Sequence, residues 1–298
     1  MKSTVISSLR FLSVFLVFTV LFILPSVVIP VSPALLKETN PEEMELFFPL
    51  FLLFALYISG SYWLWVRNTN TNKRKVFLYL ASAGFILFPL MTWIESVFWL
   101  EDLQVMDMGE INRVFLRGSI TYLLFSGYVS VFAKNNDNEK GENEARTDYK
   151  TLMSKLVVIG VVFLIIYNFF GYFVAWQFES TRLYYTGSTE LKGFLSMLAG
   201  NFSDPKFVVV HFLRGMLFGL SGYFLYAVLR CSKIKKLIVI SLIFGAFGFQ
   251  IIMPNPVFPE MVRISHFIET TTSMLLFGLI ASYIFSLRKR SAQAKVIS

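Results

Sequence analysis

Long apolar runs recur along the chain, separated by short polar segments. Each run has roughly 17 to 25 residues, the length that an α-helix needs to cross a hydrocarbon layer of about 30 Å. A soluble core does not need so many runs of that length. The pattern predicts eight transmembrane helices, near residues 11–31, 47–66, 76–100, 115–133, 156–177, 207–229, 237–253 and 264–287. We therefore predict an all-α, polytopic transmembrane helix bundle.

The composition agrees with this fold class. Apolar residues make up 55% of the chain and charged residues 15%, whereas a soluble domain has about 25% charged residues. The net charge of +8 does not indicate nucleic-acid binding, because the basic residues form short clusters beside the apolar runs. Cys231 is the single cysteine, which excludes an internal disulfide and a multi-cysteine metal site.

The basic residues predict the orientation of the bundle. The N-terminus, the segments after spans 2, 4 and 6, and the C-terminal tail together hold 19 of the 27 Lys and Arg residues. The first two segments on the other side are acidic, with Glu38, Glu42, Glu43, Glu45, Glu101, Asp102, Asp107 and Glu110. The positive-inside rule therefore predicts that both termini are cytoplasmic.

A polar linker divides the predicted spans within one membrane domain. Residues 1–133 hold spans 1–4, residues 134–155 form the cytoplasmic linker, and residues 156–298 hold spans 5–8. Span 1 has an alternative interpretation as a cleaved secretory signal, which would leave seven spans. Its apolar run is longer than a usual signal core, and no clear cleavage motif follows it, so we favour an uncleaved helix.

Ionisable residues inside the predicted spans are the candidate site. Such residues are costly in a membrane and usually face the bundle interior or a water-filled cavity. By helix direction they all fall in the extracytoplasmic third: Glu95, Arg117, His211, Arg214, Arg263, His266 and Glu269. The last three are spaced i, i+3, i+6 and share one helix face. They follow a stiff loop with three prolines, residues 253–260.

This set of residues is open to four interpretations. It could be a structural lock of ion pairs, for instance Glu269 with Arg214 and Glu95 with Arg117. It could be a pocket for an anionic or zwitterionic ligand, because the three arginines of the set and Arg113, which also lies at the outer start of span 4, outnumber the two carboxylates. Arginine binds phosphate and carboxylate well. His211, His266 and Glu269 match the ligand types of a catalytic zinc site, although no metal motif supports it. The two histidines could also hold a haem.

The last quarter of the chain carries a recognisable pattern. Met253-Pro254, then Pro259, Val262-Arg263, His266, Glu269 and Phe277-Gly278 resemble a set of uncharacterised bacterial polytopic inner-membrane proteins with an MP…VRxxHxxE pattern before the last helix. The resemblance implies a bacterial inner-membrane location and marks Arg263, His266 and Glu269 as matching positions. It implies no chemistry.

Together these features predict a membrane protein with an outward-facing polar pocket that binds or transports a small anionic or lipid-like molecule. A membrane enzyme acting at the extracytoplasmic face through a His/Glu site, and an accessory subunit, are the alternatives. The predicted partners are the lipid bilayer and that small ligand, not a nucleic acid. The sequence specifies neither a cofactor nor an oligomeric state.

Overall fold

The structure is a computed structural model that describes residues 2–38, 41–103, 105–134 and 148–287. Regular structure within these ranges is helical, apart from two isolated β-bridges. Eight long segments make up the bundle: α1 (Lys2–Val28), α4 (Phe47–Val66), α5 (Lys73–Phe85) continued by η1 (Ile86–Leu90) and α6 (Met91–Phe98), α7 (Met108–Ser130), α8 (Tyr149–Phe173), α11 (Pro205–Ala227), α12 (Lys233–Phe249) and α13 (Glu260–Ser286). Short helices lie between them: α2 (Pro33–Lys37), α3 (Pro41–Met44), η2 (Leu100–Asp102), η3 (Ala175–Gln177), α9 (Glu179–Thr186) and α10 (Phe194–Ser203). The predicted all-α class is confirmed.

Six segments are long and apolar enough to cross a membrane, which supports a multi-pass membrane protein. They contain α1, α4, α5–α6, α8, α11 and α13. The other two long helices do not meet this description, for different reasons. α12 has only 17 residues, and α7 carries Glu110, Arg113 and Arg117 in its first half.

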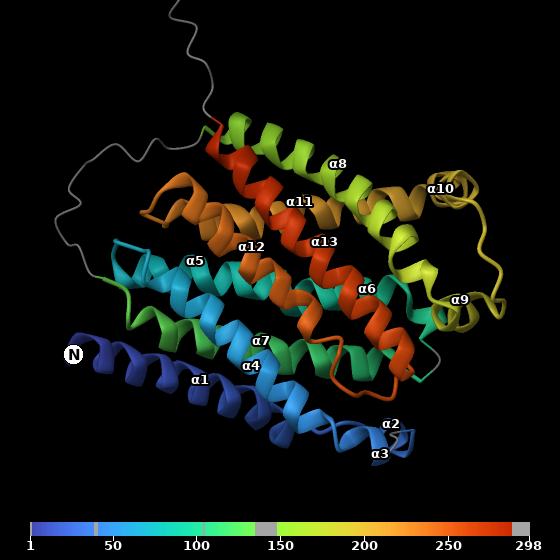
Figure 1. Cartoon of the computed structure of the whole chain (residues 1–298), viewed down its shortest axis with the longest axis horizontal. Helices are drawn as coiled ribbons and strands as arrows, with labels where there is room; N and C mark the ends of the chain where they lie inside the picture. The colour runs from blue at the N-terminus through green and yellow to red at the C-terminus, as the bar shows by residue number, and fades with distance from the viewer. Residues whose placement is uncertain (1, 39–40, 104, 135–147, 288–298) are drawn as a thin grey trace, which may run out of the picture.

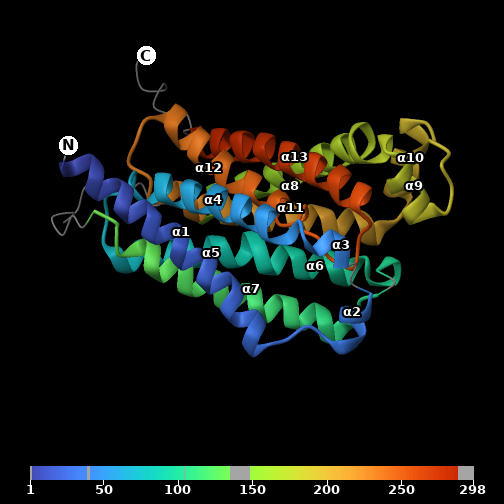
Figure 2. The same ribbon diagram turned by 60° about the horizontal axis from the view of Figure 1, so that its bottom comes forward.

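The eight long segments lie side by side, and the chain alternates between the two ends of the bundle (Figures 1 and 2). At one end the turn after α4 joins the ends of α7 and α11. Thr69 forms a β-bridge with Leu229, and Asn70 forms one with Lys134. The Arg230 amide also donates to the Asn68 carbonyl at 2.8 Å. Three turns that are distant in sequence are therefore fastened together at this end.

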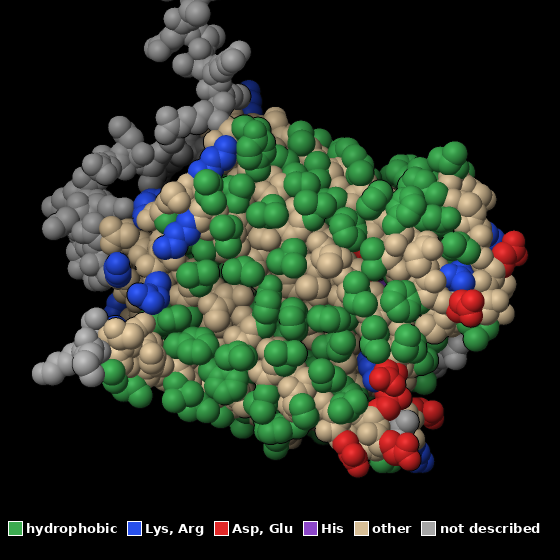
Figure 3. All heavy atoms as spheres, in the orientation of Figure 1, with side chains coloured by type: hydrophobic (Ala, Val, Ile, Leu, Met, Phe, Trp, Pro, Cys, Tyr) green, Lys and Arg blue, Asp and Glu red, His purple; other side chains and the backbone are tan. Residues whose placement is uncertain are grey.

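Charge divides the two ends of the bundle (Figure 3). On the face shown, most Lys and Arg side chains gather at the end that holds the turns 67–72 and 228–232, which we call the basic end. Asp and Glu side chains gather at the opposite end, the acidic end, and apolar side chains cover the middle. Leu9 of α1, Leu53 of α4 and Ile165 of α8 are each more than half exposed. A hydrocarbon layer would cover such a surface.

Glycines let the helices that carry the candidate site pack closely. A Cβ atom added to Gly215 of α11 would lie 2.5 Å from the Phe163 Cβ and 2.9 Å from the Gly160 Cα of α8. One added to Gly248 of α12 would lie 2.6 Å from the Thr271 backbone nitrogen of α13. Small residues at these contacts allow the backbones to approach one another, as in many membrane bundles.

The third long segment changes helix type beside the site. η1 is a π-helical turn that contains Pro89. Proline has no amide hydrogen, and its ring collides with the preceding turn of a regular α-helix, so the chain widens there. α6 continues from this turn and carries Glu95.

Several helix boundaries differ from the predicted ones. α7 begins at Met108 rather than 115, because the Asp107 side chain accepts a hydrogen bond from the Glu110 amide and caps the helix. α13 begins at Glu260 rather than 264, directly after Pro259. α8 begins at Tyr149, within the predicted linker. Residues 135–147 of that linker and the tail 288–298 lie outside the described residues.

Candidate functional site

A buried ion pair lies between α6 and α11 near the acidic end. The Arg214 Nη2 is 2.7 Å from the Glu95 Oε2. The Arg214 side chain is only 3% exposed, whereas that of Glu95 is 36% exposed. The guanidinium also lies 5.8 Å from the ring centre of Phe163 and 5.9 Å from that of Phe218. Because arginine does not lose its proton in proteins, this buried charge depends on the carboxylate beside it.

A second carboxylate, Glu269 of α13, belongs to the same group. It lies close enough to Glu95 and Arg214 to interact electrostatically with both. Its Oε2 accepts a hydrogen bond from the Thr270 hydroxyl at 2.8 Å. Within the described part of the chain it forms no ion pair with a lysine or arginine. Two carboxylates therefore share one guanidinium.

His211 of α11 is fully buried one turn before Arg214. Its Nδ1 is 2.9 Å from the Phe207 carbonyl oxygen. A carbonyl can only accept, so we infer that Nδ1 carries the hydrogen and that Nε2 is an acceptor. Among the described residues, Nε2 has no hydrogen-bond partner. A buried acceptor without a donor is uncommon and indicates a missing partner.

Tyr167 of α8 closes the group from another side. Its hydroxyl interacts electrostatically with Glu95, Arg214 and Glu269 and lies near the Trp99 side chain. The Tyr167 ring centre is 4.2 Å from that of His211.

His266 of α13 lies on the side of this group nearer the acidic end. Its Nε2 is 3.0 Å from the Tyr185 hydroxyl of α9, and the ring also lies beside Phe258. His266 interacts electrostatically with Glu95 as well. We call the whole set the inner cluster, and it consists of Glu95, Tyr167, His211, Arg214, His266 and Glu269.

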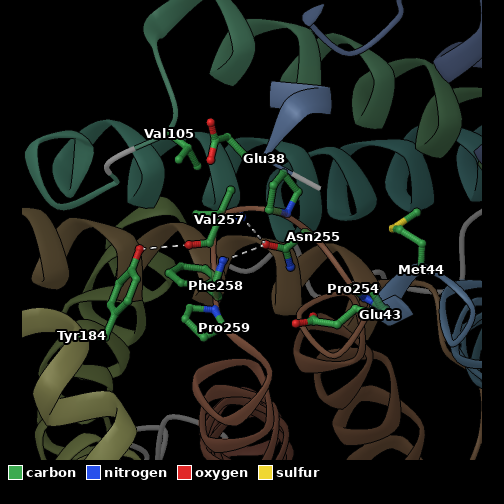
Figure 4. Close-up of a pocket in the computed structure, with 11 residues that line it drawn as sticks. Glu38, Glu43, Met44, Val105, Tyr184, Pro254, Asn255, Val257, Phe258 and Pro259 are labelled. Atoms are coloured by element: carbon green, nitrogen blue, oxygen red, sulfur yellow. Dashed lines mark hydrogen bonds between the residues drawn. The ribbon is translucent and has the colours of Figure 1, made fainter. Parts of the chain in front are cut away.

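A cavity of about 340 Å³ opens at the acidic end, beside the proline-rich loop (Figure 4). We call it the loop cavity; its lining comprises Glu38, Glu43, Met44, Val105, Tyr184 and residues 254–259. The Tyr184 hydroxyl donates to the Val257 carbonyl at 3.0 Å. The Asn255 Oδ1 accepts from the amides of Val257 and Phe258. These bonds, with the fixed φ angles of the prolines, hold the loop in a defined shape.

Arg263 supports the wall of the loop cavity. Its buried guanidinium donates to the Glu43 carboxylate at 2.5 Å and to the Phe258 carbonyl at 3.0 Å. Glu43 and Phe258 both line the cavity. His266, one turn further along α13, contacts Phe258 from the side of the inner cluster. Phe258 and His266 therefore stand between the cavity and the cluster.

Arg117 belongs to a separate group on α7. Its Nη2 is 2.8 Å from the Glu110 carboxylate, and the Arg113 Nη1 lies 3.2 Å from the same side chain. The Ser32 amide also donates to Glu110 at 3.0 Å. Glu110 is 2% exposed, so its charge is buried and balanced.

The structure thus brings together five of the seven candidates: Glu95, His211, Arg214, His266 and Glu269. The two ion pairs suggested from the sequence are wrong. Arg214 pairs with Glu95 rather than Glu269, and Arg117 pairs with Glu110 rather than Glu95. The second error has a simple cause: Glu110 precedes Arg117 by seven residues, which places both on one face of the same helix.

The predicted surplus of positive charge is also absent among these residues. Arg263 pairs with Glu43, Arg113 and Arg117 share Glu110, and Arg214 pairs with Glu95. With Glu43 and Glu110 included, four carboxylates match the four arginines. The inner cluster taken alone has two carboxylates and one arginine.

The histidines do not fit a metal or a haem. Within the described ranges, no group of three His, Cys, Asp or Glu side chains could hold a metal ion, so His211, His266 and Glu269 do not form one. The His211 ring stacks on Phe207 with ring centres 4.2 Å apart and lies equally close to Tyr167. These rings fill the space beside His211 that a porphyrin would need.

Several site residues were missed from the sequence. Glu110 could have been found from its spacing to Arg113 and Arg117. Arg182 lies between two predicted spans and gave no signal, but it is buried and donates to the carbonyls of Trp176 and Thr189. Tyr167 gave no signal, because nothing in the sequence distinguishes an inward-facing aromatic residue among 33 Phe and 13 Tyr residues.

Comparison of the chain with protein-family models, curated proteins and solved structures finds no match. The resemblance around Met253-Pro254 and Arg263, His266 and Glu269 therefore stays a prediction.

Proposed function

We propose that the chain crosses the bacterial inner membrane eight times, with its basic end in the cytoplasm. The basic clusters at one end and the acidic residues at the other support this orientation. α7 and α12 run between the same two ends as the six apolar segments. The charges of α7 are paired around Glu110, which lowers the cost of placing them near the membrane boundary.

Reporter fusions test this topology. Reporters after residues 70, 142, 234 and 295 should give a cytoplasmic signal, and reporters after residues 40, 105 and 190 should give an extracytoplasmic one. A cytoplasmic signal from residue 190 would contradict the eight-span arrangement, because it would place the α9–α10 region on the wrong side.

We further propose that the inner cluster binds a small solute that arrives from the extracytoplasmic face, for uptake, export or sensing. One observation carries this proposal: the buried Arg214 is paired with a carboxylate that keeps 36% of its side chain exposed. A purely structural lock gains most when both partners are buried and fully hydrogen-bonded. Here the Glu95 side is open, and Glu269 has no arginine of its own.

The anionic or lipid-like solute predicted from the sequence loses its main argument. That argument depended on spare arginines, and the described arginines of this region have carboxylate or carbonyl partners. The membrane-enzyme alternative depended on a His/Glu or metal site, and the described residues provide no metal group. We therefore still propose a solute site, but we no longer propose that its solute is anionic.

A structural lock is the second candidate, and specific contacts favour it elsewhere in the bundle. The Glu110 group joins α7 to Ser32, and Arg263 joins α13 to Glu43. Both groups connect elements that are distant in sequence. A structural lock predicts that the inner cluster only joins helices, as these two groups do, whereas a solute site predicts that it also binds a ligand.

Complementation of a deletion strain of the source organism separates the two candidates. The variants Glu269→Gln and His211→Gln are compared with Glu260→Gln, an exposed residue of the same helix α13. A solute site predicts that the cluster variants reach normal abundance and lose the cellular phenotype, while Glu260→Gln retains both. If every loss of phenotype follows a loss of folded protein, the cluster is a lock.

A further inference from the structure

The inner cluster combines two carboxylates and a buried imidazole nitrogen with a single arginine, and both the His211 Nε2 and the Arg214 Nε are without a hydrogen-bond partner among the described residues. Glu95 and Glu269 can only accept while ionised, and the His211 Nε2 is an acceptor without a partner. The opposing charged donor is Arg214, which Glu95 engages at 2.7 Å. On the basis of the proposed function, we propose that the solute carries a protonated amine, bound by Glu269 and Glu95 with the His211 Nε2 as an additional acceptor.

The charges in the cluster favour a cation. The pair between Arg214 and Glu95 is close to neutral as a unit, and Glu269, when ionised, adds one negative charge within electrostatic range of both. An unmatched carboxylate in a region of low dielectric must take up a proton or a cation. An ammonium group provides both the charge and several N–H donors in one ligand group.

His211 gives an independent indication of the same chemistry. The hydrogen bond from Nδ1 to the Phe207 carbonyl fixes the tautomer, so Nε2 presents a lone pair. This atom is buried, and none of the described residues donates to it. An anion without O–H or N–H groups, such as benzoate, could not satisfy it, because it brings no donor. A protonated amine brings up to three N–H donors.

The surrounding rings are also suited to a cation. Phe98, Phe207 and Tyr167 all lie within 5.3 Å of the His211 ring, measured between ring centres. Trp99 reaches the Tyr167 hydroxyl. The faces of aromatic rings attract ammonium groups by about 0.5–2 kcal/mol. An ammonium ion that reaches the His211 Nε2 would therefore lie among these aromatic rings.

The loop cavity provides a route with matching charge. Two carboxylates line it, Glu38 and Glu43, and Arg263 balances Glu43. A cleft lined by one sign of charge raises the local concentration of ions of the opposite sign. Phe258 and the hydrogen-bonded pair of Tyr185 and His266 separate this cavity from the inner cluster. A solute that enters through this cavity displaces this partition to reach Glu269, whereas the side of Glu95 is already exposed.

The test uses the full chain in lipid nanodiscs, with radiolabelled methylammonium and choline as cationic probes and benzoate as the anionic probe. Equilibrium binding is measured for the wild type, Glu269→Gln and the matched control Glu260→Gln. We expect at least one cationic probe to bind, with affinity at least about tenfold weaker in Glu269→Gln and unchanged in Glu260→Gln. The same probe should raise the melting temperature of the wild type, a result that does not depend on any variant.

Two outcomes would overturn the amine assignment in different ways. If benzoate binds and the cations do not, and Arg214→Gln abolishes that binding, the cluster is a solute site for anions and only the amine class is wrong. If none of the three probes binds or shifts the melting temperature, the amine class is also wrong. The complementation experiment then tests separately whether the inner cluster is a solute site. Cation binding that is equal in Glu269→Gln and wild type would likewise overturn the assignment.

Discussion

The Arg214 guanidinium and the Glu95 carboxylate are 2.7 Å apart, yet one side chain is 3% exposed and the other 36%. Breaking the ion pair would therefore cost more free energy for the buried Arg214 than for Glu95. On our proposal that the exposed side of Glu95 faces water, Glu95 can still be hydrated without its partner, whereas the buried Arg214 cannot be. This inequality distinguishes an open site from a closed lock, and it leads to the first prediction.

Glu95→Gln should destabilise the protein more than Arg214→Gln does. Removing the Glu95 carboxylate leaves the buried guanidinium with no carboxylate in contact, because Glu269 interacts with it only at longer range; losing such a buried partner costs roughly 3–5 kcal/mol. Removing the guanidinium leaves Glu95 with its exposed side, and Glu269 loses only the longer-range interaction. Melting temperatures of both variants in the same detergent provide the measurement. Equal losses, or a larger loss in Arg214→Gln, would mean that the Glu95 side is closed in solution.

The group around Glu110 gives a second comparison, between two arginines on one helix. Arg117 is 14% exposed and Arg113 is 44% exposed, although both contact the same carboxylate. We expect Arg117→Gln to cost about 1–3 kcal/mol, because a buried charged hydrogen bond is lost. Arg113→Gln should cost at most about 1 kcal/mol, as for other solvent-exposed pairs. Thermal unfolding of the two variants side by side measures the difference, and a reversed order would show that Glu110 depends on Arg113.

Helix packing gives a third prediction. A Cβ atom at Gly248 would lie 2.3 Å from the Thr271 hydroxyl oxygen and 2.6 Å from the Thr271 nitrogen. Gly248→Ala should therefore force α12 and α13 apart and cost about 1–3 kcal/mol. At Gly171 no atom lies within 4 Å of the added Cβ, so Gly171→Ala is the matched control and should be neutral or slightly stabilising. Folded yield and melting temperature measure both. A tolerated Gly248→Ala would show that these helices are less closely packed than described.

Much of the bundle could be predicted from the sequence because apolar length and charge are strong local signals. The helices α4, α11 and α13 overlap closely with the predicted spans. The direction of each helix also predicts that one end of the bundle, the extracytoplasmic one, holds the following residues: Glu95, His211, Arg214, His266 and Glu269. That inference needs only the order of the spans.

Rotation of each helix about its axis could not be predicted in the same way. Arg117 lies on a predicted span and at the right depth, but it turns towards Glu110 and Ser32 rather than Glu95. The π turn at Pro89 changes the rotation of α6 relative to α5, and no periodicity in the sequence reports it. The partners of Arg263 come from α3 and the proline-rich loop, which lie outside the predicted spans. Ion pairing in the site therefore depends on tertiary packing.

The central claim is that the inner cluster is reached by water from the extracytoplasmic face, and thiol labelling tests it most directly. Cys231, the single native cysteine, is first replaced by alanine, and Glu269→Cys is then introduced, which leaves the pair of Arg214 and Glu95 intact. Intact cells are treated with trimethylammonium-ethyl methanethiosulfonate, a cationic reagent that does not cross membranes.

Ser265→Cys is the control, because Ser265 lies one turn away on α13 but is fully buried against Thr181. We expect the thiol introduced at position 269 to be labelled from outside the cell, and the one at position 265 to remain unlabelled. Labelling at position 269 only after the membrane has been permeabilised, or no labelling at all, would contradict an extracytoplasmic solute site.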